Sequence, residues 1–197
     1  MAIGSSTENR DRILDAADEA LGAVGYRRMR IEDLAQAAGI AKGTVYLSFD
    51  SKAEIALACN DRKAGQVLER MEAVARGNGS VSQRLEGALV ERVLVRLDYV
   101  RGHATSVDEI LSAIRPELLA RRDAHFEAEA RVLTEMLRGV VNAREKAAAM
   151  IDATNALLPY SLSVREMGRR AEVARRAERV ARLVVQGALS PTRRSPP

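Results

Sequence analysis

Aromatic residues are scarce in this chain: they make up 3% of its 197 residues, and tryptophan is absent. The only cysteine, Cys59, cannot form an internal disulfide, so we expect it to be a small buried apolar residue. A membrane span needs about 18 consecutive apolar residues, which the sequence lacks, and residues 1–12 are polar, without the apolar core of a signal peptide. We therefore expect a cytoplasmic protein that makes no use of a membrane.

The motifs of common enzyme classes are also missing. The sequence contains no glycine-rich loop of the nucleotide-binding type and no G-x-S-x-G nucleophile motif. His103 and His125 are the only histidines, and the H-x-E that begins at His125 is not followed by the P-C-x-x-C of zinc deaminases. We expect a protein that is not an enzyme, with no catalytic residues, no metal site and no cofactor.

The residues that are abundant favour an all-α globular fold. Apolar types account for 47% of the chain and charged types for 29%, and Ala, Leu, Arg and Glu, which favour helices, dominate. The net charge of +4 is unevenly spread: residues 1–58 hold seven Lys and Arg against nine Asp and Glu, and residues 59–197 hold 24 against 18. The overall basicity therefore does not mark a nucleic-acid-binding end.

Apolar spacing and helix-stop residues predict about nine helices. Gly39 is expected to end the second helix in the left-handed conformation, and the Asp50–Ser51 turn to cap the fourth. In the last helix, glutamates between the arginines indicate an ion-paired face above an apolar seam of Val173, Ala177, Val180 and Val184. The principal helices are predicted over residues 9–24, 31–38, 42–49, 52–75, 82–100, 116–139, 143–158 and 165–188, before a disordered tail over 190–197.

Residues 30–49 have the pattern of a helix-turn-helix, two short helices joined by a turn that contains Gly39. In this motif the second helix enters the major groove of DNA. Ala35, Gly39 and Val45 lie where the two helices must approach closely, and the groove accepts the second helix only if its outward residues are short. Gly43 and Thr44 meet that requirement.

Side-chain chemistry suggests which residues contact DNA. Lys42 can reach a phosphate or a guanine edge, Thr44 can offer its hydroxyl to a phosphate and its methyl to thymine, and Tyr46 can reach a phosphate. Lys52 adds a cation beside the free N–H groups at the start of the fourth helix. Tyr46 packed beneath its helix, and Lys42 and Lys52 as plain solvated charges, are the alternatives. The predicted DNA-binding residues are Arg30, Lys42, Gly43, Thr44, Tyr46 and Lys52.

The same segment resembles the N-terminal signature of TetR-family regulators. The resemblance covers residues 9–58 and departs from the family at two positions. Arg30 stands where Ser or Thr usually caps the second helix, so the side-chain cap is lost and we expect Arg30 to contact a phosphate instead. Ser48 stands where an aromatic residue or His is frequent, so one possible DNA contact is lost. The matching residues are Gly25, Tyr26, Ile31, Leu34, Ala35, Ala38–Ile40, Lys42–Tyr46, Phe49, Ser51 and Lys52.

The resemblance implies a three-helix DNA-binding domain over 1–51, a helical effector-binding and dimerisation domain over 52–189, and the tail. It implies a homodimer through the last two helices, for which Leu157, Val173, Val180 and Val184 are candidates. It also implies a repressor that a small-molecule effector of unknown identity releases from a pseudo-palindromic double-stranded operator. The effector pocket is expected among residues 85–158, with Arg96, Asp98, Tyr99 and Asn155 as candidate polar groups.

Two functions from other classes stay open at this point. A nonspecific architectural DNA binder would show no preference for an inverted repeat, and a helical ligand-binding protein with a vestigial helix-turn-helix would bind its ligand and no DNA. The sequence does not distinguish a repressor from an activator.

Overall fold

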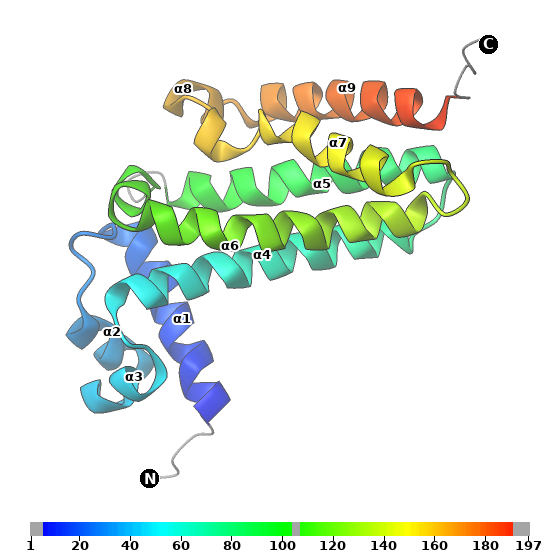
Figure 1. Ribbon diagram of the computed structural model, residues 1–197. Coiled ribbons are helices and arrows are strands. Elements are labelled where there is room, and N and C mark those ends of the chain that lie inside the picture. Colours follow the sequence, from blue (N-terminus) through cyan, green and yellow to red (C-terminus); the bar gives the residue numbers. More distant parts are fainter. Residues whose placement is uncertain (1–5, 104–106, 191–197) are drawn as a thin grey trace. The chain divides into compact units, whose positions relative to one another are not determined.

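The structure, a computed structural model, describes residues 6–103 and 107–190 (Figure 1). Within these ranges it contains nine α-helices, one short 3-10 helix and no strand, so the predicted all-α fold is confirmed. The chain forms two compact units. Unit 1 comprises residues up to 64 together with 100–122, and unit 2 comprises 65–99 and the residues from 123 onward. The predicted boundary between functional domains at residue 51 stays a prediction. The predicted tail lies, beyond residue 190, outside the described residues.

Unit 1 contains the three N-terminal helices, α1 (Ser6–Ala23), α2 (Ile31–Ala38) and α3 (Lys42–Ser48), and the first part of α4 (Lys52–Ala75). The end of α5 (Val81–Gly102) and the first part of α6 (Val107–Met136) complete it. Its core is apolar, with Ile13, Ala17, Val45 and Ile55 fully buried. The predicted bounds of α2 and α4 are those observed, and Ser51 Oγ accepts a hydrogen bond from the Glu54 amide at 3.1 Å, as expected of a cap.

Unit 2 contains the rest of α4, α5 and α6 with α7 (Ala143–Asn155), a 3-10 turn (Pro159–Ser161), α8 (Val164–Met167) and α9 (Arg170–Leu189). Helices α7 and α9 lie side by side (Figure 1). The core of unit 2 draws residues from all five long helices; they include Val67, Leu85, Leu89, Leu133, Met150, Ala181 and Val185.

Helix α6 begins earlier than predicted. The sequence places Pro116 in the first turn of a helix, whereas α6 starts at Val107 and has non-helical backbone angles at Ile114, φ −136° and ψ 26°. Proline lacks the N–H that would bond to the carbonyl four residues earlier, and its ring crowds that carbonyl. Pro116 therefore lies in the first turn of the second part of α6, and the turns before the kink are a separate helical segment that the apolar spacing did not reveal.

The single helix predicted over 165–188 is wrong, because two helices occupy this stretch. Ser163 and Glu166 form a capping box at the start of α8, which ends after four residues, and α9 starts again at Arg170. The predicted seam is also out of phase: α9 buries Val173, Ala177, Ala181 and Val185, while Val180 and Val184 stay partly exposed. The buried residues of α9, which packs against α7, therefore follow a spacing of four and not the heptad spacing assumed from the sequence.

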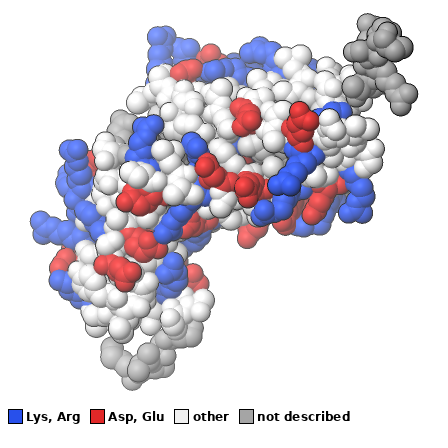
Figure 2. Space-filling view, in the orientation of Figure 1, with Lys and Arg blue, Asp and Glu red and all other residues white. Residues whose placement is uncertain are grey.

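Two of the arginines of α8 and α9 form ion pairs at the surface, which agrees in part with the predicted ion-paired face. Arg170 binds both carboxylate oxygens of Asp98 at 2.6 and 2.8 Å, and Arg176 binds Glu166 at 2.8 Å. Figure 2 shows basic and acidic side chains interspersed over the visible face of the molecule. Exposed pairs of this kind contribute roughly 0–1 kcal/mol each, so they keep the surface solvated more than they stabilise it.

Candidate nucleic-acid interface

The turn between α2 and α3 has the geometry that a helix-turn-helix requires. Gly39 has φ +64° and ψ +36°, the left-handed conformation predicted for it, and the Ile40 amide bonds to the Ala35 carbonyl at 3.0 Å. A Cβ on Gly39 would stand 2.7 Å from Arg12 Nη2. Helix α1 packs on both α2 and α3, with Ala35 and Val45 buried where the helices meet. The predicted helix-turn-helix is therefore present as a packed unit.

One face of α3 is held in the core and the other is open to solvent. Val45 is completely buried, while Tyr46 is 49% exposed and Leu47 is 88% exposed. A Cβ on Gly43 would have no neighbour within 4 Å, so the surface beside Lys42 is unobstructed. Thr44 is only partly buried. Four of the six predicted residues thus lie together on α3, and Tyr46 does not pack beneath its helix.

Lys42 is paired with an acidic residue of α2. Its ammonium lies 2.5 Å from Glu32 Oε1 and 5.9 Å from the centre of the Tyr46 ring, and both charged side chains are about half exposed. The hydrogen bond to Lys42 lowers the pKa of Glu32, and the same bond raises the pKa of Lys42. An exposed pair of this kind is weak in water. A phosphate that approached α3 would therefore compete with Glu32 for the ammonium at small cost.

Lys52 has an internal role that the sequence did not predict. Its ammonium donates to the carbonyl oxygens of Tyr26 at 3.0 Å, Arg27 at 3.3 Å and Met29 at 3.3 Å, and it lies 4.6 Å from the centre of the Tyr26 ring. An ammonium has three donors, and all three are used here. Lys52 therefore fixes the loop between α1 and α2 at the start of α4, and a contact with DNA stays a prediction.

Arg30 occupies the N-cap position of α2 in an extended conformation, and its side chain makes no capping hydrogen bond. The predicted loss of the side-chain cap is therefore confirmed. The Arg30 side chain is exposed. Its contact with a phosphate stays a prediction.

Two residues of this surface were missed by the sequence reasoning. Arg10 of α1 donates to the Ser48 carbonyl at 3.1 Å and its guanidinium lies 4.2 Å from the centre of the Phe49 ring, so it anchors the end of α3 to α1. Leu47 is the other. Its position two residues after buried Val45 places it on the opposite side of a helix, and this spacing was the available signal.

Residues that suggested metal or redox chemistry have ordinary structural places. Cys59 is buried beside α1, with Sγ 3.9 Å from the Leu14 carbonyl, and burial raises the pKa of its thiol. His103 donates through Nε2 to the Asp18 carbonyl at 3.0 Å. Among residues 6–103 and 107–190, no cluster of three or more His, Cys, Asp and Glu side chains is placed to hold a metal. No helix in the same ranges is long and apolar enough to cross a membrane.

Unit 2 contains a buried charged network that includes two of the predicted pocket groups, Arg96 and Asn155. Arg92 and Glu129, 0% and 1% exposed, form an ion pair of 2.5 Å. Arg92 also donates to Thr154 Oγ1 and Asn155 Oδ1, each at 2.7 Å, and stacks 4.8 Å from the centre of the Phe126 ring. Arg96 completes the network by binding the second oxygen of Glu129. Sequence reasoning missed both Arg92 and Glu129, because charged residues on amphipathic helices are usually solvated.

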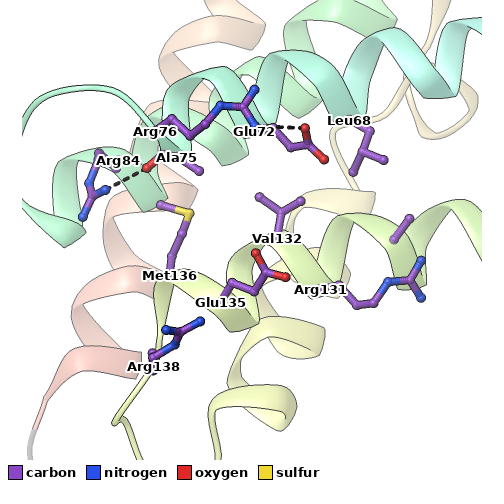
Figure 3. Close-up of a pocket in the computed structure, with 11 residues that line it drawn as sticks. Leu68, Glu72, Ala75, Arg76, Arg84, Arg131, Val132, Glu135, Met136 and Arg138 are labelled. Carbon is purple, nitrogen blue, oxygen red and sulfur yellow. Dashed lines mark hydrogen bonds and ion pairs between the residues drawn. The ribbon is translucent and has the colours of Figure 1, made fainter.

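The candidate polar groups for a pocket do not line a cavity found in the described part of unit 2. Asn155 and Arg96 are engaged in the buried network, and Asp98 is bound by Arg170 at the surface. The cavity, of about 600 Å³, lies between α4, the start of α5 and the end of α6 (Figure 3). None of the four predicted polar groups is among its lining residues.

Comparison with known proteins places the helix-turn-helix in a family. The family described as "Bacterial regulatory proteins, tetR family" matches residues 13–59, which run from α1 into α4. The match identifies residues 13–59 as a TetR-type N-terminal domain. The predicted resemblance is therefore confirmed, and the TetR-type domain includes the open face of α3.

Individual proteins of known sequence or structure are also similar to this chain. The fatty acid metabolism regulator protein of Bacillus subtilis (strain 168) is 35% identical over 74 residues, which are 38% of this chain and 38% of that protein. A transcriptional regulator from Rhodococcus sp. Rha1 shares 21% identity at TM-score 0.67, covering 92% of this chain and 99% of that one. The FadR regulator of Bacillus subtilis, solved in complex with stearoyl-CoA, shares 20% identity at TM-score 0.58, covering 90% and 98%. At these identities the solved structures show the fold alone, which this chain shares with them over about nine-tenths of its length.

Proposed function

We propose that the protein is a sequence-specific DNA-binding transcriptional regulator that acts as a homodimer. The observation that carries the proposal is the open face of α3, where Gly43, Tyr46 and Leu47 stand out from a helix whose opposite face is buried. A recognition helix needs this combination, because the groove admits it only when its outward side is unobstructed. The TetR-family match over residues 13–59 supports the same assignment.

Two copies of α3 would enter successive major grooves of a pseudo-palindromic operator, about 34 Å apart. The dimer would form through α7 and α9. Leu157 and Val173, which the sequence suggested for this interface, are 3% and 1% exposed within one protomer and are excluded from it. Leu183 of α9, 64% exposed, and the small exposed residues Ala148, Ala149 and Gly187 are better suited to close helix packing.

The protein would be a cytoplasmic repressor without catalytic activity. A small-molecule effector would release it from the operator. The names of the similar proteins, a fatty acid metabolism regulator and a FadR solved with stearoyl-CoA, support a fatty-acyl compound as the effector class. An effector acts only through different affinities for the DNA-binding and the released conformations.

Contacts within unit 1 support a route by which such a signal would reach the DNA-binding helices. The Arg27 amide, in the loop before α2, donates to Glu109 of α6 at 2.9 Å, and Arg121 of α6 binds Glu54 of α4 at 2.9 Å. A Cβ added to Gly22 of α1 would stand 3.1 Å from the Gly102 carbonyl oxygen, so α1 and the end of α5 approach closely there. A shift of α5 or α6 would therefore move α1 and the α1–α2 loop directly.

The test is selection of bound sequences from a random double-stranded DNA pool at a fixed moderate salt concentration, since phosphate contacts make affinity salt-dependent. We expect an enriched inverted repeat. An unselective bound pool would favour an architectural DNA binder, and no retained DNA would favour a ligand-binding protein with a vestigial helix-turn-helix. Either result, from protein shown to be folded and dimeric by sedimentation, would overturn the proposal.

The Lys42→Ala/Tyr46→Ala variant tests the assigned face. Loss of one phosphate or base contact at each position should weaken operator binding roughly 10- to 100-fold. The matched control is Arg165→Ala/Tyr160→Ala in unit 2, which removes a cation and a tyrosine of nearly equal exposure, 48% against 49%. Operator affinity should be unchanged in the control, and equal loss in both variants would remove α3 from the interface.

A further inference from the structure

The cavity of unit 2 combines positive charge with an apolar floor. Its volume of about 600 Å³ is within the range of small-molecule sites. Figure 3 shows the floor residues Val132 and Met136 of α6 pointing toward α4, from which Leu68 faces them. Around them stand four arginines and two glutamates, so the lining has an excess of two positive charges: Arg76, Arg84, Arg131 and Arg138 with Glu72 and Glu135.

Two of the four guanidinium groups are not committed to another protein group. Arg76 binds Glu72 at 3.2 Å. Within residues 6–103 and 107–190, the guanidinium groups of Arg131 and Arg138 have no hydrogen bond or ion pair with the protein. Both side chains are exposed. Solvated guanidinium groups that border one cavity provide forked donors that match phosphate and carboxylate oxygens.

Arg84 supplies an independent indication of an anion. Its Nη1 donates to the Ala75 carbonyl at the end of α4, at 2.7 Å, which fixes the side chain beside the cavity. Its Nε is buried and has no hydrogen-bond partner. A buried donor without an acceptor costs free energy, and the cost is larger on a charged group. A small shift of the side chain toward the cavity would let an oxygen of a bound anion satisfy this donor.

The apolar floor of the cavity favours a ligand that carries an apolar chain as well as a charge. Leu68 and Met136 pack against the core of unit 2, and Val132 is part of that core. A thioether side chain such as that of Met136 adapts to irregular apolar ligands. Free inorganic anions would gain nothing from this surface, whereas an alkyl or acyl segment would be removed from water on it.

From this geometry we propose that the cavity binds a soluble amphiphilic anion, a phosphate or carboxylate group joined to an apolar chain. The anionic group lies beside Arg84 and Arg138, and the chain lies on Val132 and Met136. Arg131, at the other end of the lining, adds to the positive charge (Figure 3). The proposal rests on the proposed function in that it names a site and a ligand class for the effector. Binding is measured without DNA, so the site can fail while operator selection succeeds, and the reverse.

The probes are octyl phosphate, octanoate, octanol and inorganic phosphate, titrated below micelle-forming concentrations into the full chain by calorimetry. Both octyl anions should bind at least tenfold more tightly than octanol, which lacks the charge, and than inorganic phosphate, which lacks the chain. Equal affinity of inorganic and octyl phosphate would overturn the role of the floor. Binding to phosphatidylglycerol vesicles in place of the soluble probes would overturn the proposal of a free ligand.

The variant Arg131→Gln/Arg138→Gln removes two exposed cations and should weaken octyl phosphate binding at least tenfold without a change in thermal stability. Arg165→Gln is the control, because this arginine of α8 is exposed and lies outside the cavity lining. Met136→Gln should weaken octyl phosphate and leave the weak inorganic phosphate binding unchanged. Octyl phosphate affinity equal to that of the unaltered chain in the double variant would place the ligand elsewhere.

Discussion

The two units bury different kinds of side chain. In the described part of unit 1, Asn9 is the only buried polar residue beside an otherwise apolar core. Unit 2 buries a complete ion pair, Arg92 with Glu129, together with Thr154. The fold of unit 1 therefore depends on apolar periodicity and the turn at Gly39. The fold of unit 2 depends also on the hydrogen-bond geometry of Arg92.

The buried network joins three helices at once. Arg92 lies on α5, Glu129 on α6 and Thr154 on α7, and the Arg92 guanidinium donates to both of the others. Burial lowers the pKa of Arg92, and the adjacent Glu129 carboxylate opposes that shift. Because a displaced helix would leave a buried charge without its partner, the network fixes how α5, α6 and α7 align.

The largest expected effect comes from breaking this pair. Glu129→Met leaves the Arg92 charge buried without a carboxylate and should lower the free energy of unfolding by about 3–5 kcal/mol. Urea unfolding measures the loss, and hydrogen exchange should place it in α5 and α7 of unit 2, with little change in α1 to α3.

The double variant Arg92→Met/Glu129→Met separates charge from packing. Replacing both members of a buried pair by apolar residues is often nearly neutral. We expect it to recover more than half of the loss seen in Glu129→Met. A double variant as unstable as the single one would show that the remaining polar partners, Thr154 and Asn155, carry the cost.

The difference between the units also explains what the sequence could predict. The bounds of α2 and α4, the left-handed Gly39 and the buried Val45 all follow from local rules, and all are confirmed. In unit 2 the decisive facts are long-range. Arg92 meets Glu129 across 37 residues of sequence, and a pattern along one helix carries no sign of such a partner.

A second comparison uses two glycines of unit 1 that lie four residues apart. Gly39→Ala forces a side chain into the left-handed region and should destabilise the protein by about 1–2 kcal/mol. The nearby Arg12 adds little, because the end of a flexible side chain moves easily. Gly43→Ala, inside α3 and without neighbours, should instead stabilise by up to about 1 kcal/mol. Thermal unfolding of both variants measures the contrast.

The methyl group that Gly43→Ala adds would stand on the open face of α3. We expect Gly43→Ala to bind the selected operator less tightly although it is more stable. Tighter binding together with higher stability would show that this part of α3 lies away from the groove.

The candidate site was likewise predictable in part. Lys42, Gly43 and Tyr46 followed from the motif, and their positions on α3 agree with it. The engagement of Lys52 with three carbonyls did not follow, because the path of the loop before α2 cannot be obtained from spacing. The Arg84–Ala75 contact at the cavity depends in the same way on two helices meeting.

The smallest expected effect concerns the buried titratable group of unit 1. Burial, with a smaller effect of Asp18, raises the pKa of the Cys59 thiol, so the folded chain keeps its proton where the unfolded chain, with an ordinary pKa near 8.5, loses it. The stabilising contribution is therefore complete below about pH 8 and declines as the pH rises. Between pH 8 and 9.5 it should fall by about 1 kcal/mol.

Cys59→Ala isolates this contribution, since every other titratable group is the same in both proteins. We expect the variant to lose less stability than the unaltered chain over the same pH interval in urea unfolding. Hydrogen exchange should assign the difference to α1 and α4, which enclose the thiol. Parallel pH curves for the two proteins would mean that Cys59 ionises in the folded state, and unit 1 would then bury a charge as unit 2 does.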